Sequence, residues 1–295
     1  PDYAEAHYNL GNSLKNLGQL GAAVKCYEKA ITIKPDYAEA HNNLGNALMK
    51  LSQLDAAVKC YEQVVALKPD YAEAYRNHGS AMKRLKRQDE ALASYKRAIA
   101  LDPNLDFILG DLLSTKMSLC LWDDLAKNLN ELTKKINNGE KVISPFHMLA
   151  LIDDPGVQRK TAEIYANEKY PQSHVLSKIE RYPKHNKIRI GYFSADFRIH
   201  PVSHLTAELY EMHDRNQFEI HAFSFGPDTE DEMYLRIKAG VDHFHDVCEM
   251  PHKDVAMLAR SVEIDIAVDL GGYTQNCRTE IFAMSAAPIQ ISYIG

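Results

Sequence analysis

Two histidines stand where an apolar run gives way to a polar turn. The segment ADFRIHPVSHL at 195–205 follows IRIGYFS and holds His200 and His204 around a proline and a serine. We expect a strand to end here and a helix to begin by Ser203, a good N-cap residue. A helix N-terminus disfavours a positive imidazolium, so His200 should be neutral and able to accept a proton or a hydrogen bond. His200 is the candidate catalytic residue and His204 a candidate substrate-binding residue. The alternative for both is a helix-capping turn, and His204 could instead pack on the sheet.

A second polar loop, GGYTQN at 271–276, follows the apolar run IDIAVDL. The paired glycines Gly271 and Gly272 would let a ligand approach the backbone closely. Thr274 would supply a hydroxyl. We take Gly272, Tyr273 and Thr274 as candidate substrate-binding residues.

The elements that must position these loops are visible as a change of pattern after residue 187. Short apolar runs alternate with helical stretches, which is typical of a parallel sheet covered by helices on both faces. The expected strands are 187–193, 218–225, 243–247, 264–270 and 288–294, and the expected helices lie near 203–213, 229–240, 253–262 and 278–285. In a sheet of order 3-2-1-4-5 the first and fourth strands are neighbours, so both polar loops would meet where ligands bind. Neither a GxGxxG fingerprint nor a P-loop occurs, which argues against nicotinamide, flavin or P-loop nucleotide binding.

The first third of the chain is an internal repeat. The segment PDYAEAHYNLGNSLKNLGQLGAAVKCYEKAITIK at 1–34 returns at 35–68 and 69–102. A period of 34 residues with proline at the hinge predicts tetratricopeptide repeats, each a pair of helices that buries its apolar face only by stacking on neighbours. In the first copy we expect three residues of one helix to face three of the other: Leu10, Gly11 and Leu14 against Ala23, Tyr27 and Ala30.

The ends of the array depart from the pattern. Residues 104–125 keep the rhythm but carry Leu113 in place of glycine and Asp111 in place of asparagine. This indicates a degenerate terminal repeat. At the other end a complete repeat begins at Pro1 with no capping helix before it, so we expect a longer array.

One polar position recurs with the repeat. Asn9, Asn43 and Asn77 occupy the same place in three successive copies. In a solenoid such residues form a ladder along the concave surface, and an amide can bond a peptide backbone as donor and acceptor. We therefore predict peptide binding by these three asparagines. The alternative is a solvated position copied with the repeat.

Composition excludes several classes. The formal net charge is −6, and the one basic run, KRLKR at 83–87, is expected on a solvated helix face, so we expect no nucleic-acid partner. No apolar stretch approaches a membrane span. The five cysteines form no CxxC pair, and no histidine spacing suits zinc, so we expect no metal and a reducing, cytoplasmic location. His147 is expected to be a packing residue. We place the domains at 1–125 (repeats), 126–186 (helical connector) and 187–295 (Rossmann-like lobe).

The motifs in order resemble a known family. Tetratricopeptide repeats running into RIGYFSADFRIHPVSHL and then DLGGYTQNCRTEIFAMSAAPIQISYIG are similar to the O-linked N-acetylglucosamine transferases. The resemblance implies a helical solenoid followed by the N-terminal lobe of a GT-B fold, α plus α/β in class. It implies transfer of N-acetylglucosamine from UDP-N-acetylglucosamine to Ser or Thr of proteins, with inversion and without a metal or other cofactor. Protein or peptide acceptors would lie in the repeat groove.

The resemblance also assigns residues. His200 falls on the first histidine of the family's H-P-x-S-H motif, which reaches the donor cleft and could orient the sugar or act as base. Thr274 falls on the threonine of its G-Y-T motif, near the sugar. The family continues into a second lobe that holds most of the UDP, so we expect this chain alone to be inactive and to bind UDP weakly. The alternatives are transfer of fucose or glucose, and a non-catalytic tetratricopeptide scaffold.

Overall fold

The computed structural model describes residues 3–179, 182, 185–274 and 277–293. It divides into two compact units, Pro1–Ile164 and Tyr165–Gly295. The stretch 126–186, which we expected to be a separate connector, is therefore shared between the two units. Helix α10 (Pro155–Lys169) runs across the division. No helix in the described ranges is both long enough and apolar enough to cross a membrane.

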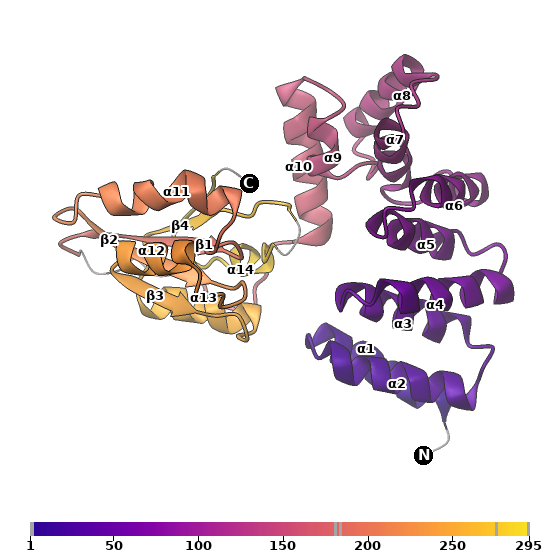
Figure 1. Ribbon diagram of the computed structural model, residues 1–295, viewed down its shortest axis with the longest axis horizontal. Coiled ribbons are helices and arrows are strands. Elements are labelled where there is room, and N and C mark those ends of the chain that lie inside the picture. The colour runs from indigo at the N-terminus through magenta and orange to yellow at the C-terminus, as the bar shows by residue number, and fades with distance from the viewer. Residues whose placement is uncertain (1–2, 180–181, 183–184, 275–276, 294–295) are drawn as a thin grey trace. The chain divides into compact units, whose positions relative to one another are not determined.

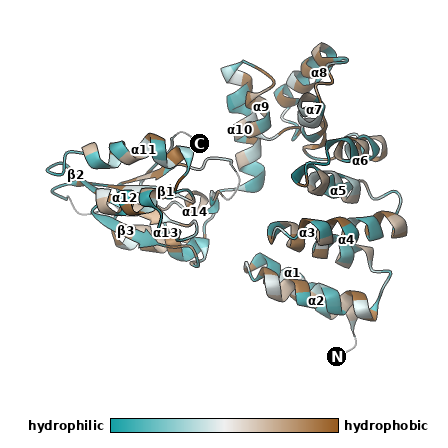
Figure 2. Cartoon of the chain, viewed as in Figure 1, coloured by the Kyte–Doolittle hydropathy of each residue, from teal (hydrophilic) through white to brown (hydrophobic). Residues whose placement is uncertain are grey.

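The first unit is built from helix pairs (Figure 1). The helices are α1 (Ala4–Asn16), α2 (Leu20–Ile33), α3 (Ala38–Lys50), α4 (Leu54–Leu67), α5 (Ala72–Arg84), α6 (Gln88–Leu101), α7 (Ile108–Ser118), α8 (Leu125–Asn137) and α9 (Pro145–Leu149). The predicted helical repeats are confirmed, and the degenerate fourth pair reaches Asn137 rather than ending near residue 125. Hydrophilic and hydrophobic residues alternate along these helices (Figure 2), as burial of one stripe requires.

A glycine packed against a tyrosine fixes the crossing of each helix pair. The pairs are Gly11–Tyr27, Gly45–Tyr61 and Gly79–Tyr95. A Cβ atom on any of these glycines would lie 2.6–2.7 Å from a carbon of the fully buried ring. In the fourth pair Leu113 and Leu129 take the two places and lie in one apolar cluster. At this repeat position glycine therefore accompanies tyrosine, and leucine accompanies leucine.

Leu10 does not pack as we expected. Its side chain is 50% exposed, whereas Leu44, one repeat later, is 7% exposed. Because stacked repeats cover one another's surfaces, this position becomes buried only where another repeat precedes it in the stack.

The second unit is a five-stranded parallel sheet of order β3-β2-β1-β4-β5, as the strand–helix alternation predicted. The strands are β1 (Ile188–Ser194), β2 (Phe218–Ser224), β3 (His243–Asp246), β4 (Ile266–Asp269) and β5 (Ile289–Ser292). The helices are α11 (Pro201–Met212), α12 (Glu232–Gly240), α13 (His252–Ser261) and α14 (Glu280–Ala283). Tyr192 packs with α11 and α12 on one face, and its neighbour Phe193 packs with α13 and α14 on the other. Helices therefore cover both faces.

We predict that Gly45→Ala destabilises the solenoid. The added methyl group would displace the Tyr61 ring, and overpacking outweighs the better helix preference of alanine by roughly 1–2 kcal/mol. Urea unfolding followed by circular dichroism measures the loss. Gly21→Ala is the matched control, because a Cβ there meets nothing within 4 Å, and it should stabilise by up to about 1 kcal/mol. Equal stability of the two variants would contradict the packing argument.

Candidate functional site

The two polar loops leave the sheet at the same edge. Strands β1 and β4 are parallel neighbours, with Phe193 in register with Asp269 near their carboxyl ends. The chain then continues into α11 from β1 and into the GGYT loop from β4 (Figure 1). The strand order reverses at this point, which is where open α/β sheets bind ligands. The geometry therefore brings the segments of His200 and Thr274 to one edge.

His200 is itself the N-cap of α11. Its backbone is extended (φ −154°, ψ 148°), and its Nδ1 accepts the N–H of Val202 at 3.3 Å. Ser203, which we expected to cap the helix, is buried in the first turn and donates its hydroxyl to the carbonyl of Asp196. The cap lies earlier than predicted because Pro201 already has the backbone angle of a first helical residue.

The capping contact decides the chemistry of the ring. As the acceptor of this bond Nδ1 carries no hydrogen, which leaves the ring hydrogen on Nε2. In this tautomer Nε2 is a hydrogen-bond donor. The side chain is 35% exposed, and Nδ1 also lies 3.7 Å from Oδ2 of Asp196. The arrangement suits donation to a ligand oxygen better than removal of a proton.

Asp231 holds the His200 loop to the next helix. One carboxylate oxygen accepts the N–H of Ile199 at 3.0 Å, and the other accepts the N–H groups of Met233 and Tyr234 at the start of α12. Desolvation raises the pKa of Asp231, but these bonds and one from Thr229 outweigh it and lower the pKa to about 2. The carboxylate is therefore charged at all ordinary pH values and fixes the loop.

Asp269 organises the GGYT loop. Its buried carboxylate accepts the N–H of Gly271 at 2.9 Å. Burial raises the pKa of Asp269, while bonds from the backbone of Gly271 and Gly272 oppose the rise. Gly272 is buried and has a positive φ of 52°, a conformation that favours glycine. We overlooked Asp269 in the sequence, although an acidic residue at the end of an apolar strand, just before two glycines, was the available signal.

Thr274 is exposed and offers an acceptor. Its hydroxyl donates to the carbonyl of Gly271 at 2.6 Å, which uses its one hydrogen and leaves the oxygen lone pairs for a ligand. His204 is also exposed, on α11, so it does not pack on the sheet, and that alternative is wrong. With Nε2 of His200, the edge thus presents one donor and one acceptor. Such a pair suits a polyhydroxylated ligand.

Tyr273 lies in a cluster of tyrosines. Its ring stacks on Tyr170 at a centroid distance of 6.2 Å and meets Tyr165 edge-on at 5.3 Å. Burial, followed by the charge of Asp269, raises the pKa of its hydroxyl. The structure gives Tyr273 a packing role, and its contact with substrate stays a prediction.

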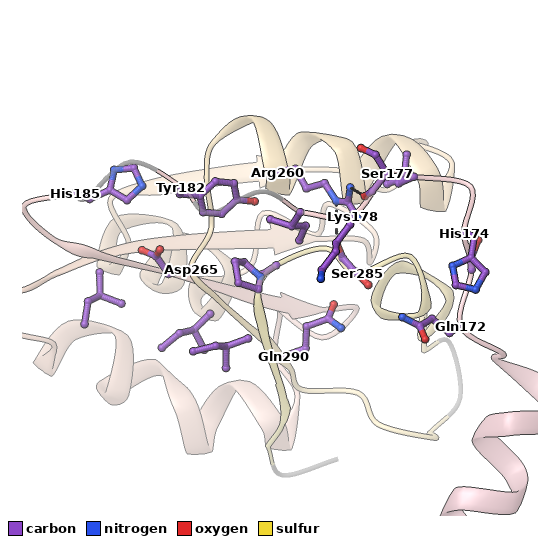
Figure 3. A pocket seen from close by; sticks show the side chains of 18 of the residues that line it. Gln172, His174, Ser177, Lys178, Tyr182, His185, Arg260, Asp265, Ser285 and Gln290 are labelled. Atoms are coloured by element: carbon purple, nitrogen blue, oxygen red, sulfur yellow. Dashed lines mark hydrogen bonds between the residues drawn. The ribbon is translucent and has the colours of Figure 1, made fainter.

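A large cavity lies at the opposite end of the sheet. It measures about 1220 Å³ and lies beside Ile188, Ile266 and Ile289, at the amino ends of three strands (Figure 3). Arg260, which borders it, is bound through all three guanidinium nitrogens to the carbonyls of Ser177, Met284 and Ser285. These bonds tie Arg260 to the backbone, and the cavity lies away from the edge that carries His200 and Thr274, so it is not the predicted site.

The asparagine ladder joins neighbouring repeats. The amide of Asn43 donates to Oη of Tyr8 at 3.1 Å and to Oδ1 of Asn12 at 2.9 Å, both in the first repeat. The amide of Asn77 donates to Oδ1 of Asn42 at 3.1 Å, again one repeat back. The predicted positions therefore recur, but the donors of Asn43 are engaged within the chain.

The fourth repeat keeps the same bond with other residues. Asp111, at the asparagine position, accepts from Nε of Arg76 at 2.9 Å, and this pair has the same 35-residue offset as Asn77 and Asn42. Where an aspartate replaces the asparagine, an arginine thus replaces the asparagine to which it bonds in the preceding repeat. Asn9 is exposed.

Comparisons with known proteins separate the repeats from the C-terminal part of the chain. Residues 157–295 match the model of glycosyl transferase family 41. Residues 11–52 and 45–86 match a TPR repeat model, and 72–105 match a tetratricopeptide repeat model.

Individual relatives point the same way. A probable UDP-N-acetylglucosamine--peptide N-acetylglucosaminyltransferase of Arabidopsis thaliana is 32% identical over 199 residues, which is 62% of this chain and 20% of the relative. The UDP-N-acetylglucosamine--peptide N-acetylglucosaminyltransferase of Caenorhabditis elegans is 29% identical over 192 residues, 60% of this chain and 17% of the relative. The chain thus spans about a fifth of the length of these relatives.

The fold matches a solved structure. A variant of the Thermobaculum terrenum O-GlcNAc transferase aligns with a TM-score of 0.53 at 23% identity, over 98% of this chain and 50% of that one. At this identity the likeness concerns the fold. The chain thus joins segments that match tetratricopeptide repeat models to a segment, residues 157–295, that matches the model of glycosyl transferase family 41.

Proposed function

We propose that this chain supplies the peptide-presenting repeats and the N-terminal GT-B lobe of a protein O-glycosyltransferase. The reaction is transfer of N-acetylglucosamine from UDP-N-acetylglucosamine to Ser or Thr hydroxyls of proteins. The observation that carries the proposal is the match of residues 157–295 to glycosyl transferase family 41, with His200 and Thr274 of that segment at one edge of the sheet. The names of the Arabidopsis and Caenorhabditis relatives supply the donor and the acceptor class.

In the proposed reaction the acceptor oxygen attacks the anomeric carbon from the face opposite UDP. The new C–O bond forms as the bond to the β-phosphate oxygen breaks, so configuration inverts, UDP leaves with the electron pair, and the hydroxyl proton passes to a phosphate oxygen of UDP or to water. Nε2–H of His200 donates to an oxygen of the donor substrate, and Oγ1 of Thr274 accepts from a sugar hydroxyl or amide. Both contacts orient the sugar and need no metal. The tautomer of His200 favours this role over that of the base.

The repeats are proposed to hold the acceptor polypeptide along the asparagine ladder. Their partner is then an extended protein segment bound mainly through its backbone. All five cysteines are free thiols, which fits action in the reducing cytoplasm.

We predict that His200→Ala lowers kcat/KM for glycosyl transfer by about 10²–10³-fold in the intact protein, the usual cost of losing one preorganised hydrogen-bond donor. The imidazole, rather than the cap, should carry the effect. His200→Asn tests this, because asparagine is an excellent N-cap and preserves the start of α11 while removing the ring. Steady-state kinetics with UDP-N-acetylglucosamine and a peptide acceptor measure both variants.

The outcomes separate chemistry from folding. Comparable losses in His200→Ala and His200→Asn support the orienting role. Activity of His200→Asn within a few-fold of the unmodified protein would reduce His200 to a helix cap. His204→Ala, on the first turn of α11, controls for disturbance of the loop and should retain most turnover.

We predict that Asn9, Asn43 and Asn77 changed together to alanine weaken binding of an acceptor peptide. Each lost neutral hydrogen bond is worth roughly 0.5–1.5 kcal/mol, so calorimetric titration should resolve the change. Thermal unfolding of the free variant must be measured alongside, because Asn43 and Asn77 also join repeats. Asn16→Ala, off the ladder, is the control. An unchanged peptide affinity in the triple variant would remove the ladder from acceptor binding.

A further inference from the structure

A polar cluster lies across the two strands at one edge of the sheet. Glu219 and His221 alternate along β2 and project from the same face as His243 and His245 of β3. His221 is in register with His243, and the two rings lie 4.5 Å apart between centroids. The described ranges contain no other group of three or more histidine, cysteine or carboxylate side chains placed to hold a metal ion.

The possible ligand atoms lie about as far from one another as the ligands of a bound metal ion do. Nε2 of His221 lies 3.2 Å from Oε1 of Glu219, and Nε2 of His243 lies 3.0 Å from the same oxygen. The three atoms all lie within 4.8 Å of one another. Around Zn²⁺, with bonds of about 2.0–2.1 Å, tetrahedral ligands are separated by about 3.3 Å. Small rotations of the side chains would therefore close the site.

We propose that Glu219, His221 and His243 bind one divalent first-row transition-metal ion. Two imidazoles and one carboxylate suit Zn²⁺ and its neighbours, and poorly suit Mg²⁺ or Ca²⁺, which prefer oxygen. The side chain of His243 is 51% exposed and that of His221 is 4% exposed. An ion would enter past His243 and keep water in its remaining positions.

The surroundings complete the site. Nδ1 of His221 lies 3.1 Å from Nε2 of His245. When Nε2 of His221 binds the ion, Nδ1 carries the hydrogen and donates it to His245, the usual support of a ligating imidazole. Arg189 lies 3.4 Å from the second oxygen of Glu219 and anchors that carboxylate.

The site is separate from the proposed transfer chemistry. Glu219 and His243 stand at the amino ends of β2 and β3, whereas His200 follows the carboxyl end of β1. A bound ion would tie the edge strand β3 to β2. Its role is thus structural or regulatory, and it accords with a transfer reaction that uses no metal.

Zn²⁺ binding to the purified chain tests the proposal. Calorimetric titration should give one ion per chain, and Co²⁺ should produce the visible absorption bands of a low-symmetry site. His243→Ala and Glu219→Gln should each weaken Zn²⁺ binding at least tenfold, and His245→Gln about 10–100-fold. His243 is chosen because its exposure leaves the core intact, and circular dichroism verifies folding. His174→Ala, at another exposed histidine, should bind like the unmodified chain.

Two results would overturn the site. One is the absence of Zn²⁺ and Co²⁺ binding by the folded chain. The other is binding that His243→Ala and Glu219→Gln leave unchanged, which would place the ion on other groups such as the free thiols. Neither result bears on glycosyl transfer, so the two proposals fail or stand independently.

Discussion

Parallel pairing of β1 with β4 is the constraint on which the second unit depends. The chain builds the sheet outward from β1 to β3 and then returns to place β4 on the other side of β1. The helices α11 and α12 therefore cover one face of the sheet, and α13 and α14 cover the other. The pairing also delivers the His200 and Thr274 loops to one edge. Two buried or capping carboxylates, Asp269 and Asp231, then hold those loops by accepting backbone N–H groups. The polar edge is thus preorganised by bonds to the main chain, and its exposed atoms remain for a ligand.

The first unit rests on a different contact, the tyrosine ring seated on a glycine. It sets how closely paired helices approach, and the fourth pair shows that both partners change together to leucine. Stacking of pairs relies on polar bonds as well. The equivalent hydrogen bond joins two asparagine amides between the second and third repeats, and Arg76 to Asp111 between the third and fourth. The residues at these two positions, one repeat apart, therefore change together so that the hydrogen bond between repeats is kept.

The helix pairs and the strands could be predicted from the sequence, because they depend on its periodicity. The 34-residue repeat and the alternation of apolar runs fixed the helix pairs, the strand order and the edge that carries His200. What depends on side-chain geometry was not legible. Capping by His200 instead of Ser203 required the backbone angles around Pro201. The cluster of Glu219, His221 and His243 is invisible to motif spacing, because its ligands come from two strands and meet only through their register.

The proposed peptide binding would couple recognition to the elasticity of the solenoid, through the hydrogen bonds between repeats. An extended polypeptide that takes the amide hydrogens of Asn43 must compete with Tyr8 and Asn12, which hold the first repeat to the second. Each such exchange would replace a hydrogen bond between neighbouring repeats with a hydrogen bond to the bound peptide. In the proposed complex the solenoid would then be softer between those repeats that hold the peptide most tightly. Long acceptors would be accommodated by changes in pitch, distributed over many repeats, instead of by a single hinge.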